Sequence, residues 1–369
     1  MNPGLEYGQA GEIADALLAF FAVEIVGGLP SSDASIESVR SVDPTFNASI
    51  EYRAGASFTI GLNEGCVDGI FRALNSSDEH DLTIARRLTE DLFGSQEEID
   101  AVLNGMLNLC VFFVLLHEFS HIACGHIHAA VGNGQSGFTL NEIGTSDRLG
   151  DSGLAGGEVT GVDANKVFEL EADSTAYELL LEHAETILRA SPGLDRIAWE
   201  EKAGAEAVPK MAFLACALVV ALTEGQRHEA GRETGHPRAL TRILNLCLAN
   251  LLLFLPGDWR VEEFVRKLKI DEAAEAVIFG RIVPTIVDAI EFCRIGCAGM
   301  EMELSLRYEA EIGSVTFGRA FAKDFASLAV GREEELATEP GQEYAALQRV
   351  RRLLIPRMGV HRQASWWTI

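Results

Sequence analysis

A long apolar segment that contains two histidines and a glutamate is the feature that most constrains the fold. From Gln96 to about Cys124, the spacing of apolar residues predicts one helix that is apolar around most of its surface. Such a helix lies in the interior and contacts other elements on most sides. His117, Glu118 and His121 would be costly to bury there without partners. The fold must therefore bring other polar groups, or an ion, to these three side chains.

The spacing of these three residues favours an ion. His117, Glu118 and His121 form an HExxH motif, and residues four apart lie one turn apart on the same helix face. Both imidazoles could therefore bind one Zn²⁺. Glu118 lies too far round the helix to be a third ligand, but it could act on a metal-held water as general base. The alternative is a pair of histidines whose hydrogen bonds are satisfied within a core helix.

A catalytic zinc needs a third protein ligand and an open fourth position. A second helix is predicted from near Asp163 to about Ala190, and Glu169 and Asp173 share one face of it. Glu169 is the candidate third ligand, and Asp173 could accept a hydrogen bond from the outer nitrogen of a zinc-bound histidine. Glu171 points about 200° away from Glu169, and we expect it to face solvent. The alternative for the whole segment is a solvated acidic face.

The succession of HExxH and ExxAD resembles the gluzincin metallopeptidases, with the closest pattern in the HtpX and CAAX-prenyl-protease group. Soluble phage-exclusion peptidases of the Lit type are similar as well. The resemblance implies a predominantly helical zincin-like core. It also implies that His117, His121 and Glu169 bind zinc, that Glu118 is the general base and that Asp173 orients a ligand.

A third segment agrees with this resemblance. His236-Pro237, followed by Arg242-Ile243, is similar to the HPxxxxRI segment that follows ExxAD in that group. Pro237 suits the first turn of a helix. A histidine or arginine that enters the cleft from there could stabilise the oxyanion of a tetrahedral intermediate, so His236 and Arg242 are candidate catalytic residues. The alternative for His236 is a surface residue that caps the helix.

Nearby residues offer other ligand patterns that fit less well. A metzincin would have a third histidine at position 127, where this chain has isoleucine, and His126 and His128 stand at other offsets. We expect His126 at the helix end, where a cation is favoured. Cys124 is interpreted as a buried core thiol, with an inhibitory or redox-sensitive ligand as the alternative.

Composition narrows the possible partners. The chain has 55 acidic and 30 basic residues, for a formal net charge of −25. A nucleic-acid-binding protein needs a basic surface that displaces counterions from phosphates, so no nucleic-acid partner is expected. The expected partner is a protein or peptide substrate. The sequence does not indicate an oligomeric state.

The cysteines and the apolar runs bear on the compartment. Seven dispersed cysteines are typical of buried thiols in a reducing environment, and no targeting segment is evident. The longest charge-free apolar runs are shorter than the roughly 18–20 residues that a membrane-spanning helix needs; they are Ala101–Leu116, Met211–Thr223 and Ile243–Gly257. We therefore expect a cytoplasmic protein without a transmembrane segment, unlike the membrane-embedded members of the group it resembles.

The remaining pattern predicts an α+β fold that is mostly helical, with a small N-terminal sheet. Strands are predicted at Ser49–Tyr52 and Ser57–Leu62, after a polar, turn-rich segment over Ser31–Pro44. The second strand alternates in polarity and could pair with an extended substrate. Further helices are predicted at 12–26, 67–74, 82–93, 208–222, 237–255, 261–268, 272–292, 317–328 and 341–355.

Three parts of the chain are expected. Residues 1–95 would form the N-terminal α/β part of the catalytic unit, 96–257 the zincin-like helical core, and 258–369 a C-terminal helical region. The glycine-rich insertion 132–161 within the core would be either a lid or a disordered insertion.

Together these patterns predict a zinc-dependent endopeptidase in which Glu118 takes a proton from water and passes it to the leaving amine. A zinc hydrolase that acts on a non-peptide amide is also compatible with the motif. An alternative of another class is a regulatory or scaffold protein on a zincin-derived fold, which would bind a protein partner without cleaving it.

Overall fold

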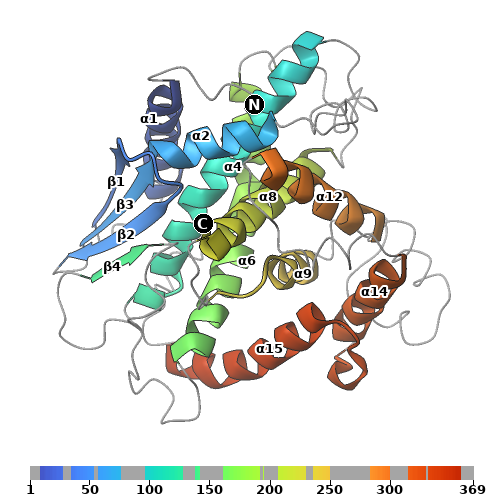
Figure 1. Ribbon diagram of the computed structural model, residues 1–369. Helices are drawn as coiled ribbons and strands as arrows, with labels where there is room; N and C mark the ends of the chain where they lie inside the picture. The colour runs from blue at the N-terminus through green and yellow to red at the C-terminus, as the bar shows by residue number, and fades with distance from the viewer. Residues whose placement is uncertain are drawn as a thin grey trace.

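The computed structural model confirms an α+β fold that is predominantly helical, with one small sheet at its side (Figure 1). It describes residues 9–27, 35–53, 57–75, 96–127, 138–141, 161–191, 194, 207–229, 236–249, 283–299, 315–329 and 331–358. The α-helices are α1 (Gln9–Phe21), α2 (Glu64–Leu74), α4 (Gln96–Ala123), α6 (Gly161–Ala190), α8 (Ala207–Glu229), α9 (Ala239–Ala249), α12 (Val283–Gly299), α14 (Val315–Ala329) and α15 (Glu339–Met358). A π-helical turn η1 (Ala22–Val26) and a 3-10 turn η5 (Glu333–Glu335) complete the helical elements of the described residues.

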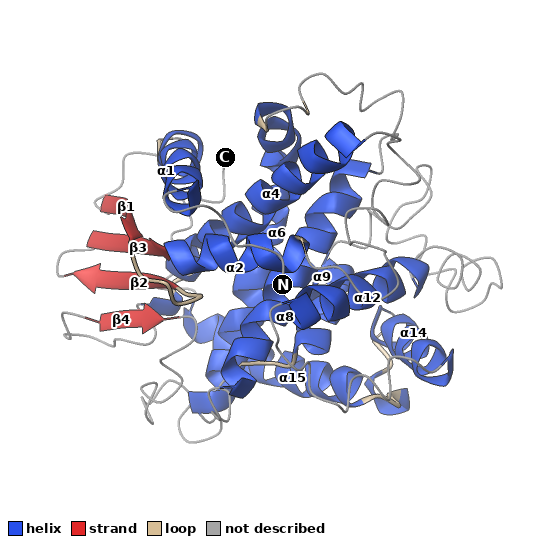
Figure 2. Cartoon of the chain, turned by 45° about the horizontal axis from the view of Figure 1, so that its top comes forward, coloured by secondary structure: helices blue, strands red, loops and turns tan. Residues whose placement is uncertain are grey.

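The sheet lies on one flank of the helices (Figure 2). Its strands are β1 (Ser35–Ser41), β2 (Ala48–Arg53), β3 (Ser57–Asn63) and β4 (Phe138–Asn141). They are ordered β1-β3-β2-β4, with β1 parallel to β3 and the other pairs antiparallel. The two predicted strands are confirmed as β2 and β3. β4 lies inside the glycine-rich segment 132–161, most of which falls outside the described residues.

The first strand corrects the expectation of a turn-rich segment over Ser31–Pro44. β1 is mostly exposed and polar, so no apolar alternation marks it in the sequence. Its backbone pairs with β3 over its whole length, from Ser35 opposite Ser57 to Ser41 opposite Asn63. Pairing with a neighbour distant in the sequence, and not its own side chains, makes this segment a strand.

The position of β3 overturns the idea that it pairs with a substrate. β1 occupies one of its edges and β2 occupies the other, so its backbone hydrogen bonds are already used. The predicted half-buried strand is also buried on both faces, because it is central in the sheet and helices α2 and α4 pack against it. Within the described strands, an added strand could pair only with β1 or β4.

Helix α4 is confirmed as a buried, mostly apolar helix that begins at Gln96 and ends at Ala123. Every residue from Leu109 to Ile127 is buried. Just beyond the helix, Gly125 adopts a φ of 79° and its N–H donates to the carbonyl of Ile122 at 3.0 Å. This left-handed conformation suits glycine and turns the chain back toward the interior.

The other helix predictions agree with the structure to within three residues at most of the ends that can be compared. Helix α8 is an exception, because it ends at Glu229, seven residues beyond the end predicted at Leu222. Helix α9 begins at Ala239, two residues after Pro237. Helix α12 ends at Gly299, seven residues beyond the end predicted at Phe292. The segments 82–93, 250–255, 261–268 and 272–282 lie outside the described residues.

Helix α6 is the partner of α4 and also contacts α8, α9 and α15. One large apolar cluster includes side chains from Ala10 to Phe325, and a smaller one lies between α6 and α15. All seven cysteines are buried free thiols, as expected.

Two helical segments are long and apolar enough to cross a membrane, Ala101–Ala123 and Ala207–Glu224. These segments are longer than the charge-free runs in the sequence, because a helix that could span a membrane can contain one or two charged residues. Within the most apolar window of each segment, 83% and 78% of the residues are buried inside the protein. The apolar side chains of these two helices are therefore accounted for by their packing in the core of the protein.

Candidate metal and catalytic site

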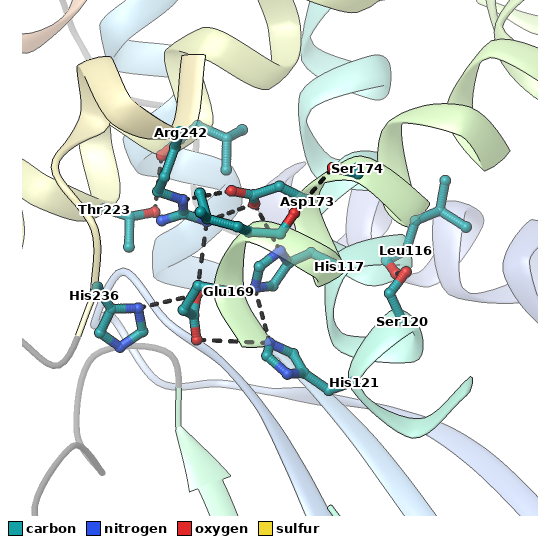
Figure 3. A network of polar contacts seen from close by, with 12 residues as sticks. Leu116, His117, Ser120, His121, Glu169, Asp173, Ser174, Thr223, His236 and Arg242 are labelled. Carbon is teal, nitrogen blue, oxygen red and sulfur yellow. Dashed lines mark hydrogen bonds and ion pairs between the residues drawn. The ribbon is translucent and has the colours of Figure 1, made fainter. Parts of the chain in front are cut away.

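Helices α4 and α6 bring His117, His121 and Glu169 together (Figure 3). The two histidines lie on one face of the last turns of α4, and Glu169 approaches them from α6. The Nε2 atoms of the histidines are 3.1 Å apart. Oε2 of Glu169 lies 3.4 Å from Nε2 of His117, and Oε1 lies 3.7 Å from Nε2 of His121. All three side chains are buried.

This donor set fits a Zn²⁺ ion. Two ligand atoms bound at about 2.0–2.1 Å to a tetrahedral ion lie about 3.3 Å apart, which is close to the separations among the three side chains. Two imidazole nitrogens and one carboxylate are ligand types that zinc prefers, and three protein ligands leave one position for water or substrate. The three residues can therefore hold a metal.

Asp173 contacts the second nitrogen of His117. Its Oδ1 lies 3.0 Å from Nδ1 of His117, and the guanidinium of Arg242 donates to both of its oxygens at 2.7 Å. Burial raises the pKa of Asp173, but the charge and hydrogen bonds of Arg242 and the contact with His117 outweigh it, so the pKa is lowered. An ionised Asp173 can accept the Nδ1–H of His117 and leave Nε2 free to bind a metal.

Arg242 occupies a different place from the one expected of an oxyanion-stabilising residue. Its side chain is buried, it binds Asp173 bidentately, and it lies 3.8 Å from Oε2 of Glu169. These contacts hold its positive charge against the carboxylates of Asp173 and Glu169. The geometry favours a role for Arg242 in fixing Asp173 and Glu169.

Asn245, which belongs to none of the motifs found in the sequence, is buried one turn beyond Arg242 on α9. Its Nδ2 donates to the carbonyl of Leu170 at 2.8 Å and to Oγ of Ser174 at 2.7 Å. These bonds tie α9 to the segment of α6 that carries Glu169. Asn245 follows Arg242 by three residues, so both lie on the same face of the helix, and this spacing could have pointed to Asn245 in the sequence.

His236 lies at the site, not at a distant surface. Its Nδ1 is 2.9 Å from Oε2 of Glu169, and its side chain is 11% exposed. It precedes α9 and reaches Glu169 from the side opposite His117 (Figure 3). This position gives His236 access to a group bound at the site, and it is the most exposed of the residues that contact Glu169.

Glu118 is buried at 1% exposure on α4. It does not belong to the group of side chains whose ligand atoms converge, which contains His117, His121 and Glu169. The arrangement is compatible with a base that is distinct from the ligands.

The charges in the site favour a cation at its centre. Burial lowers the pKa of His117, but Asp173 and Glu169 outweigh burial and raise it well above its usual value. Burial lowers the pKa of His121, and only Glu169 opposes this effect. Burial raises the pKa of Glu169. His236, His117 and His121 lower it by more than burial raises it, so the carboxylate stays ionised. Either a proton or a metal ion satisfies the carboxylates.

The environment of His121 refines one expectation from the sequence and corrects another. Nδ1 of His126 lies 2.9 Å from Nδ1 of His121, and Nε2 of His126 lies 3.2 Å from Oε2 of Glu171. His126 thus lies just beyond the end of α4, as expected, but it is buried beside the site and contacts His121 and Glu171. Glu171 is only 6% exposed, because α15 covers the far side of α6, where Arg351 lies 3.8 Å from Glu171.

Cys124 is buried, as expected, and its Sγ lies 3.6 Å from Oγ1 of Thr175. Together with His126 and Glu171, it forms a second group of potential ligand atoms. The groups His117–His121–Glu169 and Cys124–His126–Glu171 are the candidate metal clusters of the described residues.

The buried His, His and Glu side chains define a candidate metal site of the kind found in hydrolases. A family model described as Peptidase U49 matches residues 84–251, which include the HExxH motif, the ExxAD motif and the segment from His236 to Arg242. This match supports a peptidase. No curated protein and no solved structure matches the chain.

Proposed function

We propose that this chain is a zinc-dependent endopeptidase of the gluzincin type, with His117, His121 and Glu169 as ligands and Glu118 as general base. The observation that carries the proposal is the convergence of two Nε2 atoms and one carboxylate in a buried site. The match to a peptidase family over the same segment supports it.

When bound by these residues, zinc supplies a Lewis acid that polarises the scissile carbonyl and makes water more acidic. Glu118 follows His117 on α4 and accepts the proton of the attacking water, then delivers it to the leaving amine. Asp173 holds His117 in the tautomer whose Nε2 is free, and Arg242 holds Asp173. His236 donates a hydrogen bond to the oxygen that becomes negative as the carbonyl is attacked.

The scaffold alternative would gain from a Glu169 or Asp173 that faces solvent far from His117. Instead, both carboxylates are buried and lie within 3.4 Å of the imidazole. This geometry favours the peptidase. We propose a protein or peptide substrate and, because all seven cysteines are buried free thiols, a cytoplasmic, reducing location.

The experiment compares purified wild-type protein with Glu118→Gln for zinc content and for cleavage of a casein substrate. We expect one zinc per chain in both proteins and cleavage only by the wild type. The control is Glu182→Gln, which changes an exposed glutamate on α6 in the same way. Equal cleavage by wild type and Glu118→Gln would contradict the role of Glu118, and absence of zinc from both, after exposure to zinc, would contradict the site.

A further inference from the structure

The two histidines of the candidate site have different partners at their second nitrogens. Nδ1 of His117 faces the carboxylate of Asp173 at 3.0 Å. Nδ1 of His121 faces another imidazole, that of His126, at 2.9 Å. We propose that His126 is a positioning residue for His121 and that Glu171 fixes the tautomer of His126. The inference rests on the proposed zinc site.

Proton accounting gives the direction of this chain of contacts. If Nε2 of His121 binds a metal, that nitrogen carries no proton, so Nδ1 of His121 carries the ring proton. Nδ1 of His121 is then a donor, and Nδ1 of His126 must accept. His126 is therefore neutral with its proton on Nε2, and this N–H donates to Oε2 of Glu171 at 3.2 Å. In the chain of contacts from His121 through His126 to Glu171, each contact then has one donor and one acceptor.

The same accounting argues against a second metal at Cys124, His126 and Glu171. A metal bound to Nε2 of His126 would leave the ring proton on Nδ1 of His126, which would then donate to His121. Nδ1 of His121 would become an acceptor, and its proton would move to Nε2. His121 could not then bind the first metal. A neutral His126 can therefore serve only one of the two clusters. The separations among His117, His121 and Glu169, from 3.1 to 3.7 Å, match those of ligands on one tetrahedral ion.

The surroundings hold His126 in this orientation. Its ring stacks on Phe168 with centroids 4.5 Å apart and an interplanar angle of 13°. The residue is 1% exposed. The turn at Gly125, with its φ of 79°, brings His126 back against the end of α4. Arg351 on α15 lies 3.8 Å from Oε1 of Glu171, the oxygen that His126 does not contact.

The test measures zinc affinity by competition with a chelator, for wild type, His126→Phe and His126→Asn. Phenylalanine keeps the flat ring that stacks on Phe168 but removes both nitrogens. Asparagine places its Oδ1 near the position of Nδ1 and restores the acceptor. Loss of such a partner weakens metal binding about 10- to 100-fold. We expect this loss in His126→Phe and recovery to within about threefold of wild type in His126→Asn.

Two further measurements separate positioning from general damage. Circular dichroism shows whether each variant is folded. Nitrogen-15 NMR of histidine-labelled, zinc-loaded protein should show a proton on Nδ1 of His121 and a proton on Nε2 of His126. In folded His126→Phe, the Nδ1 proton of His121 should exchange faster with water. A proton on Nδ1 of His126 in the zinc-loaded wild type would overturn the proposal.

Zinc stoichiometry separates the proposal from the second-metal alternative. We expect one zinc per chain in the wild type and in Cys124→Ser, which alters the second cluster without touching the contact between His121 and His126. Two zinc ions per wild-type chain, one of them lost in Cys124→Ser, would overturn it.

The failure of this proposal differs from the failure of the proposed function. If wild type binds zinc and loses it in His117→Ala, but folded His126→Phe binds zinc as tightly as wild type, His126 has no positioning role and the zinc site stands. If the wild type binds no zinc, both proposals fail. If it binds zinc but Glu118→Gln cleaves casein like the wild type, the mechanism fails and the role of His126 is judged from affinity alone.

Discussion

The guanidinium of Arg242 donates two hydrogen bonds of 2.7 Å to the carboxylate of Asp173, and both side chains are buried. Helix α9 supplies the arginine and helix α6 supplies the aspartate. Breaking a buried pair by removing one partner costs about 3–5 kcal/mol, because it leaves an uncompensated charge. The pair therefore contributes to the stability of the helical core, and through Asp173 it also orients His117.

Replacement of Arg242 by leucine should lower both stability and zinc affinity. We expect a loss of about 3–5 kcal/mol in the free energy of unfolding, because Asp173 is left buried without its cation. Urea denaturation measures this loss. The control is Arg189→Leu, which removes an exposed ion pair with Glu185 and should change stability by about 1 kcal/mol or less. A loss no greater than that of the control would show that the buried pair is dispensable.

His236→Ala should reduce the rate of cleavage without removing zinc. His236 contacts Glu169 but is not one of the three converging ligands. Removal of a donor that stabilises the developing oxyanion lowers kcat about 100- to 1000-fold. Steady-state kinetics and metal analysis of the same preparation test this prediction. Loss of zinc from the variant would instead make His236 a ligand.

Removal of zinc should abolish cleavage and lower thermal stability. Chelation leaves Glu169 and the imidazoles of His117 and His121 without the metal, and re-addition of zinc should restore both properties. A ligand that binds only the folded state at a free concentration of 100 times its Kd adds about 2.7 kcal/mol to stability. Calorimetric scans with and without zinc measure the shift. A folded His117→Ala control should show no comparable shift.

The stability of the wild type should decrease between acid and neutral pH in part because of Glu224. Burial raises the pKa of its carboxyl, against the opposing effects of the N–H of Ala239, which donates at 3.0 Å, and of Arg242. A carboxyl whose pKa is higher in the folded than in the unfolded state favours folding below its unfolded pKa, and this contribution is lost as pH rises through the folded pKa. We expect Glu224→Gln to be more stable than the wild type at pH 7.

Chemical denaturation at pH 4 and pH 7 tests this prediction, because the advantage of Glu224→Gln should be smaller at pH 4. Glutamine keeps an oxygen that can accept from Ala239. The exposed substitution Glu185→Gln serves as the control. An advantage that is equal at both pH values would remove ionisation of Glu224 as its cause.

The sequence predicted the helices that carry the site because each has a local signal. Apolar spacing marks α4, and spacings of four residues place His117 beside His121 and Glu169 beside Asp173 on their helix faces. The structure brings these pairs together, as the motif order indicated.

What could not be predicted depends on neighbours that are remote in the sequence. Glu171 points away from Glu169, as helix geometry requires, but only the fold shows that α15 covers that side. His126 reaches His121 through a turn at Gly125, which helix periodicity does not describe. β1 is a strand because of its pairing with β3, and the same pairing removes β3 as a place for substrate.

The candidate site draws on three segments of the chain, around His117, Glu169 and Arg242, joined through Asp173. During synthesis, the first two segments emerge before the arginine that neutralises Asp173. A chain still attached to the ribosome at that stage carries the HExxH motif but lacks the cation that steadies it. The order of the segments therefore means that the candidate site can be complete only after Arg242 has been synthesised.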